Sequence, residues 1–447
     1  MVPSSLTRIG LLAAVPIVPL MYRENRRANR KWTLSKRKPL VEVLSSPNYS
    51  NLTRWYRLVR PAIFSMTPDP ETAHKMAVFS GFFFGEVLST IRAINRLIRT
   101  SMISVSNYFF GPSVLPRRAK RANVNSRLFS TVGGLSLNLP IGVSAGFDKN
   151  GEMVNFFLHN NFSIGFAEIG SVSFLPWSGN PRPRVFRLPE DNAIINRMGL
   201  NNHGIDTLSK RLENSDLTVR CVGCAGNPCG VNITKTPDAS IEGIAAVEDF
   251  AKSFSAIVKM KNVKWITLNI SCPNTAEGKT FEDITALGSL LESVTNIDRQ
   301  GKKLFLKLAP ITSDWKPKAR EIFRLVKQFG VDAIIVANTV PDRDVHLKSH
   351  PRLLAERGGL SGPPIFERSI PLVRFAAQEG VDVIAVGGIS SGKDVYRLMR
   401  NGARAVQLYT AMVYDGPGVF VDLANGLERE LIIQGYKNVE DIIGKDL

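Results

Sequence analysis

Short apolar runs recur along the chain from about residue 140 onward, and each is separated from the next by a stretch long enough for a helix. Continuous apolar runs are typical of strands buried on both faces of a parallel sheet, and helix-length spacers indicate repeated strand–helix–strand units. The runs lie at residues 141–145, 166–170, 217–222, 226–232, 265–270, 304–308, 333–337, 383–386 and 405–408. A β/α barrel closes with eight strands, so one run must be a loop, and 217–222 competes with 226–232 for one place. The predicted fold class is α/β, a (β/α)8 TIM barrel preceded by an N-terminal helical segment that associates with a membrane.

Nearly every apolar run ends in glycine or a polar side chain. In β/α barrels the active site is built from residues at the carboxyl ends of the strands, so these positions predict one polar pocket. They include Gly146, Asp148, Lys149, Ser171, Asn232, Asn269, Lys307, Asn338, Thr339, Gly388, Tyr409 and Thr410. The last two strands of such barrels commonly bind phosphate. No GxGxxG motif opens a helix, which argues against a dinucleotide bound in the Rossmann manner.

The predicted pocket is rich in asparagine, and none of its strand-end motifs contains histidine. The asparagines are Asn196, Asn232, Asn269, Asn274 and Asn338. Amides donate and accept hydrogen bonds in fixed geometry, which suits a planar heterocycle with both N–H and C=O edges. Lys149 and Lys307 add cations for a substrate carboxylate or for the electron-rich end of a flavin ring. A single asparagine at a strand end more often only stabilises a loop, so the prediction depends on the asparagines and lysines taken together.

Cys272 is the candidate base of this pocket. A thiol can accept a proton when cations or helix ends favour its thiolate, although a single cysteine is more often a small buried apolar residue. A base beside a phosphate-anchored redox ring implies proton removal on one face of the substrate and hydride transfer on the other. Cys221, Cys224 and Cys229 form a C-x2-C-x4-C pattern without a local fourth ligand, so we expect buried reduced thiols and no metal.

The first 40 residues are predicted to be a targeting or membrane-anchor segment. An apolar stretch at 9–22 is interrupted by two prolines and followed by a run rich in arginine and lysine, a pattern similar to mitochondrial targeting segments. As a helix this stretch would cover roughly 21 Å, short of the ~30 Å hydrocarbon core. A membrane span and a cleaved or interfacial segment therefore both stay open.

Residues 41–115 are predicted to form a second, helical segment that associates with the membrane. Val87, Ile91, Ile94, Ile98 and Met102 recur at helical spacing with arginines between them, and three phenylalanines stand together at 82–84. A basic amphipathic helix of this kind either packs on the barrel or lies in a membrane surface. Residues 112–126 lack apolar periodicity and are predicted to be a linker, so the barrel domain is placed at 116–447.

The charge distribution supports this division. The chain of 447 residues carries a net charge of +18, but residues 1–130 hold 21 basic and 5 acidic side chains, whereas residues 131–447 hold 36 and 34. The excess therefore belongs to the N-terminal third, and the barrel is nearly neutral. This excludes reading the whole protein as a basic nucleic-acid binder, argues against a flavin barrel that modifies tRNA, and favours a membrane-facing leader.

Several motifs together identify a family. Residues 130–447 resemble the class 2 dihydroorotate dehydrogenases, the quinone-dependent, FMN-containing, membrane-associated enzymes of pyrimidine synthesis. The motifs are SAGFDKNGE (144–152), EIGSV (168–172), GNPRPRVFRLPED (179–191), INRMGLNNHG (195–204), NISCPNT (269–275), GGLSGPP (358–364), VGGISSG (386–392) and QLYTAM (407–412). PETAHKMA (70–77) is similar to the helix that lines the quinone tunnel in that class.

The resemblance implies roles for individual residues. FMN would contact Ala145, Gly146, Phe147, Asp148, Lys149, Ser171, Asn232, Asn269, Lys307, Ala337, Gly362, Gly388, Tyr409 and Thr410. Dihydroorotate or orotate would contact Lys149, Asn196, Arg197, Met198, Gly199, Leu200, Asn269, Asn274, Asn338 and Thr339. His74, Arg187 and Tyr409 would border the quinone tunnel. Cys272 would take a proton from C5 of dihydroorotate, a hydride would pass from C6 to the flavin, and a ubiquinone would reoxidise the flavin at the mitochondrial inner membrane.

Some positions depart from the class 2 pattern. Class 2 enzymes have serine where Cys272 stands, and cysteine is the class 1 choice. Met198 and Leu200 replace an aromatic pair beside the substrate, Ala337 stands where threonine is common, and Ser65 replaces a glutamine of the quinone tunnel. Two alternatives stay open: a class 1-like oxidase that uses fumarate or oxygen, and a membrane-tethered flavoprotein that has lost catalysis. Deleting residues 1–115 is expected to abolish quinone reduction while sparing any fumarate-linked turnover.

Overall fold

A computed structural model of the chain describes residues 51–67, 69–80, 126–158, 163–214, 227–270, 281, 283–310, 315–342 and 344–447. Several predictions fall outside these ranges: the apolar stretch at 9–22, the basic helix at 87–102, nearly all of the linker at 112–126, the run at 217–222, and the site residues Cys272 and Asn274. In the described ranges, no helix combines the length and the apolar character needed to cross a membrane.

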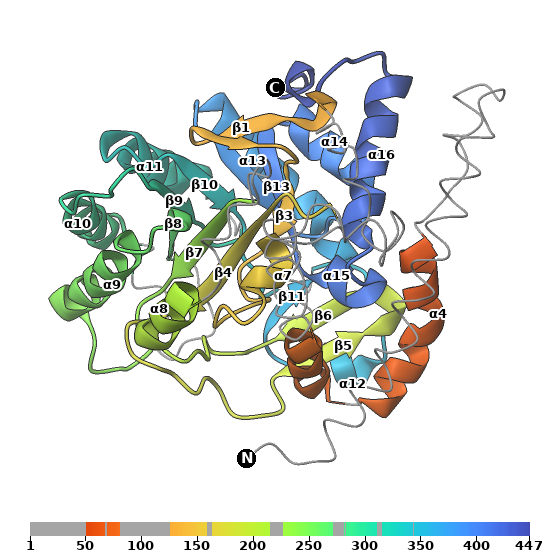
Figure 1. Cartoon of the computed structure of the whole chain (residues 1–447), viewed down its shortest axis with the longest axis horizontal. Helices are drawn as coiled ribbons and strands as arrows, with labels where there is room; N and C mark the ends of the chain where they lie inside the picture. The colour runs from red at the N-terminus through yellow and green to blue at the C-terminus, as the bar shows by residue number, and fades with distance from the viewer. Residues whose placement is uncertain are drawn as a thin grey trace, which may run out of the picture.

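The core of the molecule is a closed parallel barrel of eight strands, as the apolar runs predicted (Figure 1). The strands are β3 (Ile141–Val143), β4 (Phe166–Val172), β7 (Cys229–Ile233), β8 (Val263–Asn269), β9 (Lys303–Lys307), β10 (Ala333–Val336), β12 (Val383–Val386) and β13 (Ala403–Leu408). They pair in this order, and β13 returns to β3. Since β7 overlaps the run at 226–232, that run takes the contested place.

Continuous apolar sequence forms these strands because both of their faces are covered. All seven residues of β4 are buried, and so are all four of β10. Inside the barrel the rings of Phe166, Trp265 and Phe305 pack together, with centroids 6.0 and 5.8 Å apart. A hairpin of β1 (Ser130–Val132) and β2 (Leu135–Leu137) contributes Val132 and Leu137 to this inner cluster.

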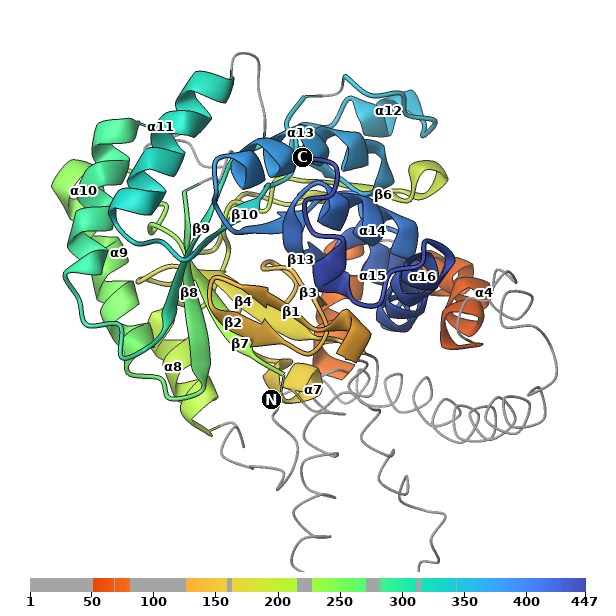
Figure 2. The ribbon, with the colours of Figure 1, turned by 90° about the horizontal axis from the view of Figure 1, so that it is seen from above.

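Amphipathic helices surround the barrel (Figure 2). They are α7 (Val154–Leu158), α8 (Ile205–Asn214), α9 (Gly243–Val258), α10 (Ile284–Thr295), α11 (Trp315–Gln328), α13 (Phe366–Gln378), α14 (Gly392–Arg400), α15 (Thr410–Asp415) and α16 (Val419–Ile433). In α11 the buried side chains Ala319, Ile322, Phe323 and Val326 recur every three or four residues, which is the pattern of one buried helix face. A capping box of Ser391 and Asp394 begins α14.

A small antiparallel sheet interrupts the strand–helix repeat and was not predicted from the apolar pattern. It pairs β5 (Val185–Leu188) with β6 (Ala193–Asn196) and β6 with β11 (Gly359–Ser361). The short helix α12 (Pro351–Leu354) precedes β11. The buried side chains of this small sheet, which include Leu188, Ile195 and Leu360, form a cluster separate from the barrel core.

The N-terminal helices pack against the C-terminal part of the chain. Helix α4 (Asn51–Met66) lies beside α15 and α16 in Figures 1 and 2. Tyr56 Oη donates to Val413 O at 2.9 Å, Arg60 Nη1 donates to Tyr414 O at 2.9 Å, and Arg57 pairs with Asp415 at 2.6 Å. Residues 70–80 form the next helix. Because α15 directly follows β13, these contacts place the N-terminal helices at the carboxyl end of the barrel.

Candidate functional site

The carboxyl ends of the barrel strands surround a cavity, as the polar strand ends predicted. The lining includes most of the residues expected to contact FMN: Ala145, Gly146, Lys149, Ser171, Asn269, Lys307, Ala337, Gly362, Gly388, Tyr409 and Thr410. It also includes most of those expected to contact substrate: Lys149, Asn196, Met198, Gly199, Leu200, Asn269, Asn338 and Thr339. The fold therefore brings residues from position 145 to position 410 into one site.

Among the described residues expected to contact FMN or substrate, four do not line the cavity: Phe147, Asp148, Asn232 and Arg197. The Asp148 carboxylate instead accepts the backbone N–H groups of Glu152 and Met153 at 2.8 and 2.7 Å, so it holds the loop after β3. Burial raises the pKa of Asp148 to about 6. The Arg197 guanidinium pairs with Glu356 at 2.8 Å, outside the cavity lining.

A buried glutamate inside the barrel was missed by the sequence analysis. Glu168 on β4 is 1% exposed, and its two carboxylate oxygens accept hydrogen bonds from Asn232 Nδ2 and Gln407 Nε2, both at 2.7 Å. Among the described residues no donor reaches Asn232 Oδ1 or Gln407 Oε1, although both atoms are buried. The sequence signal was present, because Glu168 and Gln407 are polar residues within largely apolar strands.

Two lysines and an asparagine provide the polar chemistry of the cavity. Lys307 ends β9 and is only 6% exposed, although a buried ammonium group is costly unless it has polar or anionic neighbours. Asn269 Nδ2 donates to Ser171 Oγ at 2.8 Å, and Lys149 Nζ donates to Asn201 Oδ1 at 2.7 Å. These bonds hold the side chains in place at the cavity.

Two glycines let other parts of the chain approach the cavity closely. Gly388 has φ of +74°, and a Cβ there would lie 2.5 Å from Phe366 N. Gly362 has φ of +109°, and its Cβ would lie 2.7 Å from Asn192 O. Close by, Thr410 Oγ1 donates to Ser361 Oγ at 2.8 Å. Glycine is therefore required at both positions, and the two backbones form part of the cavity wall.

Tyr409 joins the cavity to the helix at residues 70–80. Its ring stacks on His74 with centroids 6.1 Å apart and meets Phe147 edge to face at 5.3 Å. Burial, reinforced by nearby Lys149, lowers the pKa of His74 to about 4, against a smaller opposing effect from a hydrogen bond with the Phe147 backbone. Burial raises the pKa of Tyr409 to about 12. Both side chains are therefore neutral at pH 7.

Arg187, the third residue expected at the quinone tunnel, lies on β5 against the N-terminal segment. Its guanidinium covers the Phe64 ring at 4.1 Å, and Nη2 donates to Thr67 O at 2.6 Å. Burial lowers the pKa of Arg187, but an arginine begins so high that it stays charged. His74 and Arg187 both lie outside the cavity lining, on the side of the N-terminal helices.

This donor set fits a flavin mononucleotide. The buried acceptor of Gln407 lines the cavity without a donor among the described residues and suits a ring N–H, while Lys307 and Asn269 suit the ring oxygens. Gly362 and Gly388 line the cavity with backbone alone, and Gly388 follows β12, the seventh barrel strand, where such barrels commonly bind phosphate. The described residues contain no group of three or more histidine, cysteine, aspartate or glutamate side chains placed to hold a metal.

The fold and the site together define a β/α-barrel protein with an amide-lined site for a planar, anionic heterocycle. Comparison with known proteins gives the family: residues 127–431 match the pattern of the dihydroorotate dehydrogenases. The chain belongs to the dihydroorotate dehydrogenase family.

Individual relatives agree with this. The dihydroorotate dehydrogenase (quinone) of Haloarcula marismortui is 34% identical over 396 residues, which cover 88% of this chain and 100% of the relative. The enzyme of the same name from a Roseiflexus species is 34% identical over 405 residues and covers 88% and 99%. The crystal structure of the Eimeria tenella enzyme in complex with ferulenol is 31% identical, with a TM-score of 0.69 over 85% of this chain and 96% of that one.

Proposed function

We propose that this protein oxidises dihydroorotate to orotate with FMN and passes the electrons to a membrane quinone. The observation that carries the proposal is the position of Tyr409. It lines the amide-rich cavity on one side and stacks on His74 of the N-terminal helices on the other. One protein thus presents a heterocycle site and, beside it, an aromatic contact with a separate helical segment.

FMN is assigned to the inner part of the cavity. Lys307, Asn269, Ser171 and the backbone at Ala145 and Gly146 would hold the ring, and Gly362, Gly388 and Thr410 would hold the phosphate. FMN held there would supply a hydride acceptor for the substrate and an electron donor for the quinone. A carboxylate only accepts hydrogen bonds, so the amide nitrogen of Gln407 must face Glu168. The amide oxygen of Gln407, a residue of the cavity lining, therefore points away from Glu168.

The substrate is assigned to the wall made by Asn196, Met198–Leu200, Asn338 and Thr339, with Lys149 as the cation for its carboxylate. Amide donors and acceptors match the alternating N–H and C=O groups of a pyrimidine ring. Cys272 is proposed to take the C5 proton, as its place in the motif NISCPNT suggests. Asn274 of the same motif is proposed to hold the ring.

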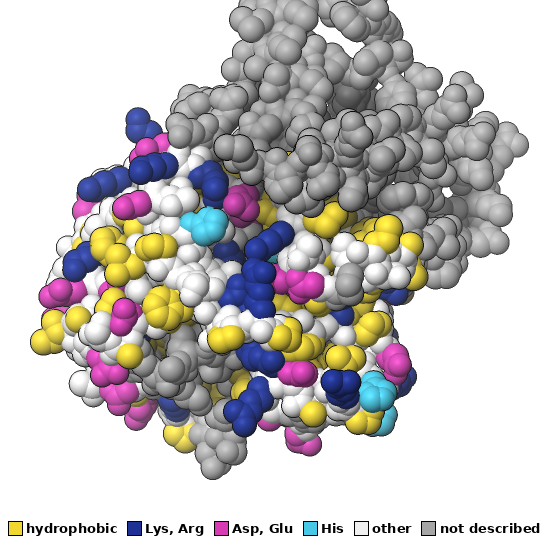
Figure 3. All heavy atoms as spheres, turned by 90° about the horizontal axis from the view of Figure 1, so that it is seen from below, with side chains coloured by type: hydrophobic (Ala, Val, Ile, Leu, Met, Phe, Trp, Pro, Cys, Tyr) yellow, Lys and Arg dark blue, Asp and Glu magenta, His cyan; other side chains and the backbone are white. Residues whose placement is uncertain are grey.

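The acceptor side is assigned to the helices at 51–66 and 70–80, with His74, Arg187 and Tyr409 along the quinone path. Membrane association and a place at the mitochondrial inner membrane are proposed from the arginine-rich first 40 residues and the amphipathic pattern at 87–102. Acidic and basic side chains are mixed on the face of the barrel drawn in Figure 3, which does not favour a nucleic-acid partner.

The test is a two-step reaction with purified protein. Anaerobic dihydroorotate is expected to bleach the flavin absorbance, and a short-chain quinone in detergent is expected to restore it faster than fumarate or oxygen does. Protein that lacks flavin and cannot take it up would refute the proposal. Reoxidation by fumarate alone would favour the class 1-like alternative, and a flavin that dihydroorotate does not bleach would favour a flavoprotein without this activity.

A further inference from the structure

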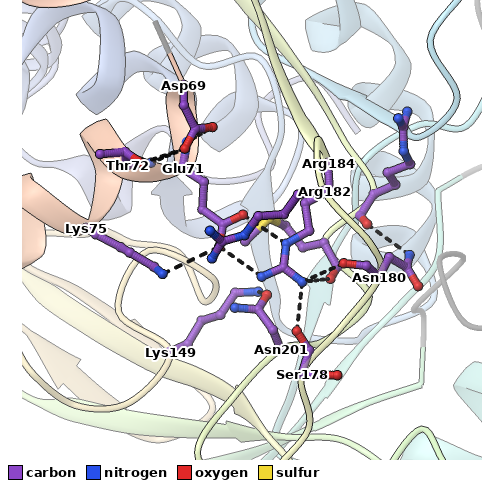
Figure 4. A network of polar contacts seen from close by, with 12 residues as sticks. Asp69, Glu71, Thr72, Lys75, Lys149, Ser178, Asn180, Arg182, Arg184 and Asn201 are labelled. Atoms are coloured by element: carbon purple, nitrogen blue, oxygen red, sulfur yellow. Dashed lines mark hydrogen bonds and ion pairs between the residues drawn. The ribbon is translucent and has the colours of Figure 1, made fainter. Parts of the chain in front are cut away.

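Glu71 is a buried charged residue outside the cavity, on the helix at residues 70–80. It is 4% exposed, and its carboxylate accepts Arg184 Nε and Nη2, both at 2.9 Å, and Arg182 Nη2 at 2.8 Å (Figure 4). Arg184 is itself only 5% exposed. The two hydrogen bonds hold the Glu71 carboxylate and the Arg184 guanidinium in one relative geometry. Removing either partner would leave the other as an uncompensated buried charge.

The remaining edge of the Arg184 guanidinium holds a turn. Nη1 donates to Ser178 O and Asn180 O, both at 2.8 Å. A guanidinium is planar, and its donors point in fixed directions. Once Glu71 holds Nε and Nη2, the direction of Nη1 is set as well, and with it the position of the turn at 178–180.

This turn supports one wall of the cavity. Asn180 N donates to Met198 O at 3.1 Å, and Asn180 Nδ2 donates to Arg197 O at 2.9 Å. The contact is close, because a Cβ at Gly199 would lie 2.7 Å from Asn180 N. Met198 and Gly199 both line the cavity, where the substrate is proposed to bind.

We propose that Glu71 is a positioning residue for the pyrimidine-acid pocket, acting through Arg184 and Asn180 on the wall at Met198 and Gly199. The inference rests on the proposed function for the identity of the ligand. The helix at 70–80 would then support the substrate site indirectly, in addition to its place on the acceptor side. Deleting residues 1–115 would leave Arg184 without its partner, so we now expect that deletion to weaken dihydroorotate binding also.

The test compares Glu71→Gln with Lys75→Gln in the full chain loaded with FMN. Lys75 lies on the same helix, 4.0 Å from the Glu71 carboxylate, but its side chain is 62% exposed and contributes little. Orotate is added to the oxidised protein, and its dissociation constant is read from the change in flavin absorbance. We expect Glu71→Gln to weaken orotate binding about tenfold or more, and Lys75→Gln to leave it within about twofold.

A second variant serves if Glu71→Gln fails to fold. Asn180→Ala removes the next link at a partly exposed position and is expected to weaken orotate binding at least about threefold. Orotate binding at the wild-type level in Glu71→Gln, or in Asn180→Ala where that is the folded variant, would overturn the inference. Failure of the proposed function is a different result, because the wild-type protein would then not bind orotate.

Discussion

The carboxylate of Glu168 on β4 accepts a 2.7 Å hydrogen bond from the Gln407 amide on β13, although β3 lies between these two strands. The bond therefore crosses the inside of the barrel. The other oxygen of the Glu168 carboxylate accepts a hydrogen bond from Asn232 Nδ2, also at 2.7 Å. One acceptor thus sets the orientation of two amides, and each amide oxygen must point away from Glu168.

Replacing Glu168 with glutamine is expected to disturb this arrangement. Glutamine presents an N–H group to one of the two amides, which must then turn or lose its partner. A buried unsatisfied group costs about 1–3 kcal/mol, so we expect a lower free energy of unfolding by that amount and a lower flavin content after purification. Denaturant unfolding and the flavin-to-protein absorbance ratio measure the two effects. Glu190→Gln, at an exposed position, is the control, and equal results for both variants would contradict the role given to Glu168.

The barrel could be predicted from the sequence because each of its strands carries its own signal. The apolar run at 166–170, for example, is buried along its whole length, and its neighbours in the sheet need not be known to recognise it. Glu168 is also visible locally, as a polar residue within a largely apolar strand, but nothing in the sequence identifies its partners. Its partners lie 64 and 239 residues away, and only the closed barrel brings them together.

The site was predicted best where residues end strands and less well beside them. Asn196 lines the cavity, but the next residue, Arg197, turns to Glu356, because successive side chains on an extended segment point to opposite sides. Asp148 is a second example: it belongs to a predicted motif, but its carboxylate accepts hydrogen bonds from backbone groups of its own loop. A motif marks a segment, and only the backbone decides which of its side chains face the ligand.

His74 gives a prediction about pH. Its pKa in the folded protein is about 4, against about 6.5 in an unfolded chain. Between these values the unfolded chain binds the proton and the folded protein does not, so the stability present above pH 6.5 is lost as the pH falls. The loss at pH 4 is at most about 3 kcal/mol.

The variant His74→Phe keeps an aromatic ring and removes this titration. The free energy of unfolding, measured by denaturant at several pH values, is expected to fall less in the variant than in the wild type between pH 6.5 and 4. The raised pKa of Asp148 acts in the opposite direction but is common to both proteins, so the difference between their curves isolates His74. Parallel curves would show that the His74 pKa is not depressed in the folded protein.

Cys272 gives a prediction about chemistry. If its sulfur takes the C5 proton, Cys272→Ala is expected to slow anaerobic flavin reduction by dihydroorotate by roughly 10²–10⁴-fold, the usual contribution of a general base. Cys272→Ser keeps a group that accepts a proton and is expected to retain substantial activity. Stopped-flow absorbance of the flavin measures both, and Cys229→Ala is a control at a buried thiol outside the cavity lining. An alanine variant within about twofold of the wild type would remove Cys272 from the mechanism.

Gly388 and Gly380 form a matched pair that tests the phosphate wall. Their φ angles are +74° and +73°, but a Cβ at Gly388 would lie 2.5 Å from Phe366 N, whereas nothing lies within 4 Å of one at Gly380. Alanine at either position pays the same backbone strain of about 1–2 kcal/mol, so only Gly388→Ala adds the overlap, worth a further 1–3 kcal/mol or so. Because Phe366 begins α13, relief of that overlap must move the helix start beside the cavity. We therefore expect Gly388→Ala to lose flavin on gel filtration while Gly380→Ala retains it, and equal retention would place the phosphate elsewhere.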